Sequence, residues 1–233
     1  GFCPPVVGRF WGNDPVVNET GIHSKPMTQP VSKVENSIMR AALISTSNVL
    51  GEAGARAVLR LKGLERYLDQ LPRNDNQLLI AGADFAALFD GMLQMYGEQT
   101  ARGLFRRWGA EFARLSLEAR PAARLLRPML NLLPQKRRAH TLLDSLTGEA
   151  NHVRGAALHW LREEETRFVV TFDDCLYCAQ LHVHEPICLS IVGTIETVLH
   201  WGTGRDYVVT ETACRARGDS FCTFTIDKQP LDV

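Results

Sequence analysis

The chain has 233 residues, which is enough for one sizeable hydrophobic core and lies at the upper end of a single domain. It carries 26 Lys and Arg against 26 Asp and Glu, so its net charge creates no attraction to nucleic acid or to an anionic membrane. The longest apolar run without a charge, 187–195, is far shorter than the ~20 residues of a membrane-spanning helix. We therefore expect neither a nucleic-acid partner nor a membrane span. Because no stretch has the order of a signal peptide, we expect a cytoplasmic location.

Residues 1–36 are rich in Pro, Gly, Asn and Ser and predict an extended arm. Phe10 and Trp11 are large for a mobile tail. They favour an arm that packs on its own domain or on a second subunit, with a mobile tail as the alternative.

From Asn36 onward the hydrophobic period is helical, and Asn36 or Ser37 can serve as the first N-cap. Gly51 is expected to end the first helix, and Gly97 to end a helix that begins after an N-cap at Asp84. Further helical segments are expected at 52–61, 63–71, 85–95, 98–119, 122–133 and 135–149. The longest of these, 98–119, places Leu104, Trp108, Phe112 and Leu115 on one stripe.

After residue 151 the period falls to two. Residues 156–161 and 167–172 predict a hairpin around the charged turn REEET, and 207–212 and 222–226 predict two closing strands. A helix at 187–201 lies between these pairs. Helices first and strands later predict an α+β fold, with N-terminal helices packed on a C-terminal antiparallel sheet. We expect 37–233 to form one domain, helical over 37–151 and β-rich over 152–228.

Five of the six cysteines lie between Cys175 and Cys222, and three of them form a spaced set with one carboxylate. The set is Cys188, Glu211, Cys214 and Cys222, and it offers three thiolates and one oxygen, a donor set that suits a tetrahedral divalent ion such as zinc. Residues 217–219 (Arg-Gly-Asp) predict a turn that brings Cys214 and Cys222 to one end of a hairpin. The strand that carries Glu211 must bend if Glu211 and Cys214 are to face one ion. With all four positions filled by protein, the ion would be structural and no catalytic residue is assigned.

Cys175 and Cys178 form a separate Cys-x2-Cys motif with several interpretations. The pair can be a second metal half-site, a redox pair or two core thiols. In one alternative, Cys175 and Cys178 replace Glu211 and Cys188 as ligands.

The pattern from Cys175 to Asp227 resembles the 4-vinyl reductase domain family, whose members bind small molecules. The resemblance rests on Asp-Cys-x2-Cys at 174–178, Cys188 before a helix that contains Gly193, Glu-x2-Cys at 211–214 and Gly-Asp-x2-Cys-x-Phe at 218–224. More loosely, the helical part from about Ser37 is similar to stand-alone members linked to bacteriochlorophyll biosynthesis.

This resemblance implies a structural zinc ion on the set of four ligands, as in related sensor domains of phenol- and xylene-responsive activators. It also implies a pocket for a small hydrophobic ligand. The helix at 98–119 and the arm before Asn36 offer more apolar surface than one domain of this length easily covers, and related sensor domains pair, so we expect a homodimer. Candidate pocket residues are Trp108, Phe112, His140, Trp160, Phe168 and Trp201.

Two functions follow from the resemblance. The first is a zinc-stabilised sensor or carrier domain. The second is a 4-vinyl reductase, or its accessory protein, acting on a chlorophyllide-type tetrapyrrole. Because the sequence shows no nicotinamide or flavin motif, we favour binding over catalysis.

Overall fold

The structure, a computed structural model, describes residues 33–120, 127–154 and 158–231. Its first half is helical, and its elements are β1 (Val34–Glu35), α1 (Asn36–Leu61), α2 (Arg66–Asp69), β2 (Leu78–Ile80), α3 (Gly82–Glu118) and α5 (Gln135–Arg154). Residues 127–130 are also helical. The second half contains β3 (His159–Glu163), β4 (Arg167–Phe172), η1 (Leu176–Cys178), α6 (Leu189–Thr203), β5 (Val209–Ala213), η2 (Arg215–Arg217) and β6 (Cys222–Asp227). The expected α+β class is confirmed.

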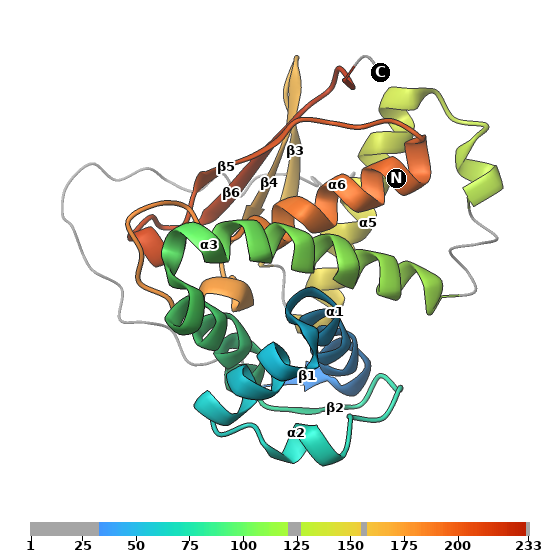
Figure 1. Ribbon diagram of the computed structural model, residues 1–233. Coiled ribbons are helices and arrows are strands. Elements are labelled where there is room, and N and C mark those ends of the chain that lie inside the picture. The colour runs from blue at the N-terminus through green and yellow to red at the C-terminus, as the bar shows by residue number, and fades with distance from the viewer. Residues whose placement is uncertain (1–32, 121–126, 155–157, 232–233) are drawn as a thin grey trace, which may run out of the picture.

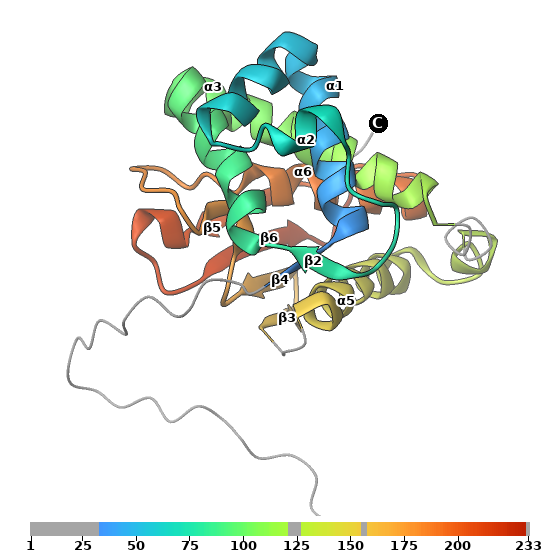
Figure 2. The same ribbon diagram turned by 90° about the horizontal axis from the view of Figure 1, so that it is seen from below.

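The four longer strands form one antiparallel sheet in the order β3-β4-β6-β5. The predicted hairpin of β3 and β4 is confirmed, with His159 opposite Phe172. Alternation along β6 buries Cys222, Phe224 and Ile226 on one face of the sheet. Helix α6 lies between that sheet and α3, while α5 packs beside β3 and α6 (Figures 1 and 2).

Two glycines bend the long helices where the sequence predicts breaks. Gly51 inside α1 and Gly97 inside α3 have φ values of 74° and 73°, a left-handed conformation that costs glycine little. The predicted ends at these residues are therefore kinks inside α1 and α3. In Figure 1 the first part of α3 turns away from the second, which runs beside α6.

Asp84 is not the N-cap that the sequence predicts. Helix α3 begins at Gly82, and Asp84 lies in its first turn. The Asp84 carboxylate instead accepts hydrogen bonds from Arg66 and from the Tyr67 hydroxyl, the latter at 2.7 Å. These tertiary donors tie α2 to α3 and replace the local backbone donor that a cap would use.

Of the four residues predicted to face inward on 98–119, only Trp108 is fully buried. Leu104, Phe112 and Leu115 are only partly buried, whereas Ala101, Phe105 and Ala113 are buried. Small residues take inward positions on this helix because α6 approaches its backbone. A Cβ built on Gly109 would lie 1.8 Å from the Ser190 carbonyl oxygen, and one on Gly193 would lie 2.0 Å from that of Arg106.

Residues 33–36, the end of the expected arm, form β1 and the first residue of α1, and β1 pairs with β2. The rest of the arm, including Phe10 and Trp11, lies outside the described residues, as do residues 122–126 of the helix expected at 122–133. Within the described part of that segment, only 127–130 are helical. Across the described residues, no helix combines the length and the hydropathy needed to span a membrane.

Candidate functional site: a buried cysteine cluster

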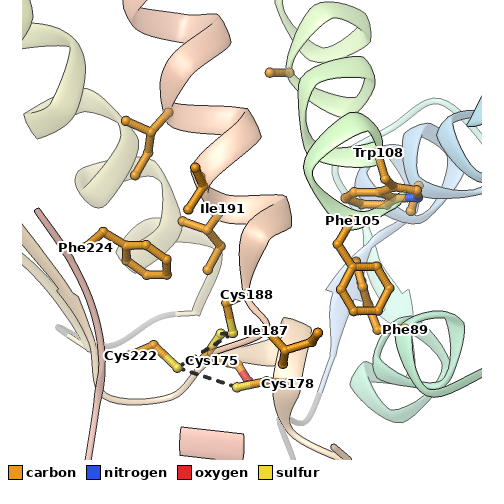
Figure 3. Packing of buried hydrophobic residues seen from close by; sticks show 14 of the residues in the cluster. Phe89, Phe105, Trp108, Cys175, Cys178, Ile187, Cys188, Ile191, Cys222 and Phe224 are labelled. Atoms are coloured by element: carbon orange, nitrogen blue, oxygen red, sulfur yellow. Dashed lines mark hydrogen bonds between the residues drawn. The ribbon is translucent and has the colours of Figure 1, made fainter. Parts of the chain in front are cut away.

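Five cysteines and one glutamate meet below the N-terminus of α6. We call Cys175, Cys178, Cys188, Glu211, Cys214 and Cys222 the cysteine cluster. Cys175 is the N-cap residue of η1 and Cys178 is the last residue of η1. Cys188 is the N-cap residue of α6, and Cys222 begins β6. Figure 3 shows four of these sulfurs converging between α6 and the sheet. All six residues are at least nine-tenths buried, and the five cysteines are not paired in disulfides.

A bulge in β5 places Glu211 and Cys214 on the same side. Residues three apart on a regular strand point to opposite faces of a sheet. Here the pairing of β5 with β6 shifts between Glu211 and Ala213, which inserts an extra residue and reorients the chain. The bend that the sequence requires is therefore present.

The turn after β5 brings Cys214 back towards Cys222. Gly218 has a φ of 105°, and the Asp219 carboxylate accepts a hydrogen bond of 2.8 Å from the Cys214 backbone N–H. The Arg215 backbone N–H donates to the Cys222 sulfur at 3.3 Å. Such donors stabilise a negatively charged sulfur.

The ligand atoms of the cluster form two overlapping groups. The sulfurs of Cys188, Cys214 and Cys222 and a Glu211 oxygen all lie within 4.8 Å of one another. The sulfurs of Cys175, Cys178, Cys188 and Cys222 satisfy the same limit. The structure thus brings the predicted ligand set together. It also brings the two cysteines of the Cys-x2-Cys motif, Cys175 and Cys178, to that site.

The Glu211 side chain is the clearest sign that the cluster is incomplete. Glu211 is 8% exposed, and among the described residues neither of its carboxylate oxygens has a hydrogen-bond partner. Burial, and then the nearby Cys214 thiolate, raise the pKa of Glu211 to about 9. A buried carboxylate without a partner is costly, and a cation among the adjacent sulfurs would remove that cost. The residues therefore fit a metal ion.

The surroundings shift the pKa values of the cysteine thiols in different directions. Burial raises the pKa of Cys188 well above its usual value, and burial likewise raises the pKa of Cys175. The neighbouring thiol of Cys178, as a hydrogen-bond donor, lowers the pKa of Cys214, so this sulfur carries the negative charge most readily.

The alternative in which Cys175 and Cys178 replace Glu211 and Cys188 stays a prediction, and the second group differs from it in its members. The second group keeps Cys188 and Cys222, and it leaves out Glu211 and Cys214. Cys188 and Cys222 therefore belong to both groups.

The candidate pocket residues fall into separate places. Trp108 and Phe112 stack on α3, with ring centroids 5.0 Å apart and an interplanar angle of 8°. His140 on α5 makes an edge contact with Phe168 on β4 at 5.9 Å. His140 also lines a surface pocket of about 430 Å³ whose other walls are Leu133, Lys136, Arg137, Thr141 and Glu163.

The two remaining tryptophans make ring contacts with other residues. Trp160 on β3 is 42% exposed and contacts Phe221, whereas Trp201 near the end of α6 lies under the Arg127 guanidinium. Of the six candidate residues, only His140 lines the surface pocket described above, and the assignment of the other five to a ligand pocket stays a prediction.

Trp108 belongs instead to an aromatic cluster, which we define as Phe85, Phe89, Phe105, Trp108, Phe112 and Tyr177. Tyr177 comes from η1, between Cys175 and Cys178, and its ring lies 5.3 Å from Phe85 and 5.2 Å from Phe89. No pattern in the sequence singles out Tyr177, since η1 is too short to show a period. Ser190 was also missed, and its buried hydroxyl has no hydrogen-bond partner within the described part of the chain.

Comparison with solved structures identifies the fold. The chain is similar to an H-NOX protein solved under the heading "Probing the function of heme distortion in the H-NOX family", with a TM-score of 0.55 and 12% identity over 85% of this chain and 97% of that chain. An H-NOX protein from S. oneidensis matches with a TM-score of 0.53 and 8% identity over 85% and 99% of the two chains. At these identities the likeness concerns the fold alone.

The phenol-responsive sensory domain of the transcription activator PoxR, in complex with phenol, also matches. Its TM-score is 0.48, with 16% identity over 66% of this chain and 77% of that chain. No curated protein sequence matches the chain.

One family model, that of the 4-vinyl reductase domain, matches residues 168–228. The matched segment contains all six residues of the cysteine cluster and the strands β4, β5 and β6. This match confirms, over residues 168–228, the resemblance seen in the sequence.

Proposed function

We propose that this chain, over residues 37–233, is a zinc-stabilised domain that binds a small hydrophobic molecule as a sensor or carrier. The observation that carries the zinc part is the buried Glu211 carboxylate, unpartnered among the described residues and grouped with three cysteine sulfurs. Cys188, Glu211, Cys214 and Cys222 would hold the ion, which would join α6 to the hairpin of β5 and β6. A cytoplasmic, reducing location belongs to the proposal because it keeps such thiols available to metal.

Native mass spectrometry of freshly purified, reduced protein tests the zinc part. At least one zinc ion per chain is expected, and Cys214→Ser should abolish zinc binding by this ligand set. Cys3→Ser, which changes the remaining cysteine, is the matched control. A reduced, folded protein without metal would refute the proposal.

The ligand part is supported by the match to the 4-vinyl reductase domain and by the aromatic cluster. Small-molecule sites in proteins are mostly apolar with a few polar anchors. The aromatic cluster offers several buried rings, and Ser190 offers a buried hydroxyl without a partner among the described residues. Because Tyr177 links these rings to η1, a molecule that displaces or joins the rings would also act on the segment carrying Cys175 and Cys178.

Phenol is the first probe for this site. It should raise the melting temperature saturably in the wild-type protein and much less in Trp108→Ala. Trp160→Phe, which alters an exposed ring, is the control and should respond like the wild type. If phenol and a panel of larger aromatic molecules leave the melting temperature unchanged, the ligand proposal fails.

A tetrapyrrole is the second candidate ligand, with the chain as a 4-vinyl reductase or its accessory protein. Its support is the resemblance to bacteriochlorophyll-linked members and the similarity in fold to the H-NOX protein solved in a study of heme distortion. Adding protochlorophyllide or a vinyl-chlorophyllide should red-shift the Soret band if the chain binds it. Turnover with a reduced nicotinamide would establish an enzyme, and binding without turnover would establish a carrier.

We also propose a homodimer. The aromatic residues of the arm favour it, and apolar surface remains around α2 and β2, where Leu68, Leu71, Leu78 and Leu79 are exposed. Sedimentation across a concentration series should show a dimer that weakens when residues 1–30 are removed. A full-length chain that stays monomeric at high micromolar concentration would contradict the dimer.

A further inference from the structure

We infer that the cysteine cluster is built for two metal ions that share the sulfurs of Cys188 and Cys222. The inference extends the proposed zinc site and rests on it. The new element is a second ion held by Cys175 and Cys178 together with the two shared sulfurs.

The number of ligands matches this arrangement. Two tetrahedra that share one edge have six corners, and the cluster supplies six ligand atoms in two groups of four with two members in common. One ion would have Glu211 and Cys214 as its own ligands, and the other Cys175 and Cys178. Each ion would reach the four-coordination that zinc prefers in structural sites.

The sulfur spacing agrees with shared tetrahedra. With a zinc–sulfur bond of about 2.3 Å, the edge of a tetrahedral site is about 3.8 Å. The two shared sulfurs, of Cys188 and Cys222, lie 3.8 Å apart. Cys175 lies 3.6 Å from Cys188, and Cys178 lies 3.5 Å from Cys222 (Figure 3). In the first group, Cys214 lies 3.7 Å from Cys188.

Two core thiols beside a single-metal site would not need this arrangement. Cys175 and Cys178 each approach a different shared sulfur at ligand-edge distance, and both are nearly fully buried. The hydrogen bond from the Cys178 thiol to the Cys175 carbonyl oxygen is long, at 3.9 Å. A second ion would engage both sulfurs at once.

Charge also favours the second ion. Binding it would release the two thiol protons of Cys175 and Cys178 to solvent, and the two new thiolates would balance the two positive charges of the ion. The net charge buried in the cluster therefore does not increase, which avoids the large cost of burying uncompensated charge. The shared sulfurs have favourable surroundings, because Cys188 caps the 15-residue helix α6 and Cys222 accepts the Arg215 backbone N–H.

Zinc titration of reduced, metal-free protein, followed by native mass spectrometry, gives the first test. Two ions per chain are expected in the wild type and in Cys3→Ser, and one ion in the double variant Cys175→Ala, Cys178→Ala. One ion in the wild type would overturn the second site and leave the proposed zinc site standing. No ion in the wild type would overturn both.

Cadmium-113 NMR of the wild-type protein tests the sharing and needs no variant. Two resonances are expected, each split by coupling to the other cadmium through the shared sulfurs. Two unsplit resonances would overturn the shared arrangement, as would a double variant that still binds two ions.

Discussion

The cysteine cluster and the aromatic cluster are neighbours in the core, and both are mostly buried. They differ in whether their buried polar groups have hydrogen-bond partners among the described residues. In the aromatic cluster, Phe89 and Trp108 meet edge to face at 4.9 Å, and the indole N–H donates to the Thr46 hydroxyl at 3.0 Å. In the cysteine cluster, a carboxylate is buried without a partner among the described residues, and the sulfurs have mainly one another. The buried rings of the aromatic cluster contact one another, whereas the cysteine cluster buries a carboxylate whose cost a bound cation would remove.

Metal removal should separate the two clusters most strongly. Chelation under reducing conditions should lower the free energy of unfolding by at least about 5 kcal/mol, less than the roughly 10–16 kcal/mol of zinc-finger peptides because most of this core packs without metal. For a domain of this size the melting temperature should fall by roughly 10–20 °C. Thermal unfolding by circular dichroism, before and after zinc is restored, measures the effect. A melting temperature indifferent to the chelator would show that the cysteine cluster is complete without an ion.

Trp108→Ala should weaken the aromatic cluster without touching the metal. Truncating a fully buried tryptophan leaves a cavity and should cost about 4 kcal/mol. Denaturant unfolding gives the energy, and mass spectrometry should show unchanged metal content. Trp108→Phe, which keeps a ring but loses the hydrogen bond to Thr46, should cost about 1–2 kcal/mol. Loss of metal in Trp108→Ala at full folding would mean that the clusters are not independent.

Gly109→Ala tests the close backbone contact between α3 and α6 at Gly109 and Ser190. The added methyl group would meet the Ser190 carbonyl oxygen, so α3 and α6 must move apart, and we expect a loss of about 2–3 kcal/mol. Gly103→Ala is the matched control on the same helix, because no heavy atom lies within 4 Å of its added Cβ. The control should be stabilised by up to about 1 kcal/mol, since alanine is the better helix former. Equal effects in the two variants, measured by denaturant unfolding, would contradict the close contact.

The sequence predicts this fold well where one residue type decides the local conformation. Gly51 and Gly97 mark the kinks, and the charged turn between β3 and β4 marks the hairpin. It fails where a distant partner decides. Asp84 has the sequence signature of an N-cap, yet Arg66 and Tyr67 supply its donors. The inward face of 98–119 is set by the backbone of α6, which no helical period encodes.

The site shows the same division. The spacing of Glu211, Cys214 and Cys222 contains the hairpin and requires a bend, which the bulge provides. The sequence-based interpretation of Cys175 and Cys178 as a separate motif assumed that each cysteine sulfur takes part in one metal site only. That two sulfurs could serve two groups depends on how close η1 comes to β6, a tertiary distance that spacing does not contain.

Tyr177 gives the smallest and most direct test of whether the clusters communicate. Its backbone lies in η1, between Cys175 and Cys178 of the cysteine cluster. Its ring packs on Phe85, Phe89 and Trp108, with ring centroids 5.2–6.2 Å apart. If the ring fixes the position of η1, a double-mutant cycle of Tyr177→Ala with Phe89→Ala should give a coupling energy of about 1 kcal/mol, typical of aromatic pairs. The experiment compares the four proteins by urea unfolding with zinc present.

Tyr177→Phe is the matched control for the ring contact. It keeps the ring and removes a hydroxyl that makes no hydrogen bond within the described residues, so unfolding should change by less than about 0.5 kcal/mol. Zinc affinity adds a second readout, because an η1 that has lost its ring contacts should hold Cys175 and Cys178 less firmly. Tyr177→Ala should therefore bind zinc more weakly than Tyr177→Phe in a competition titration with a chelator. A coupling energy near zero, with equal zinc affinity in both variants, would show that the two clusters share a core without influencing each other.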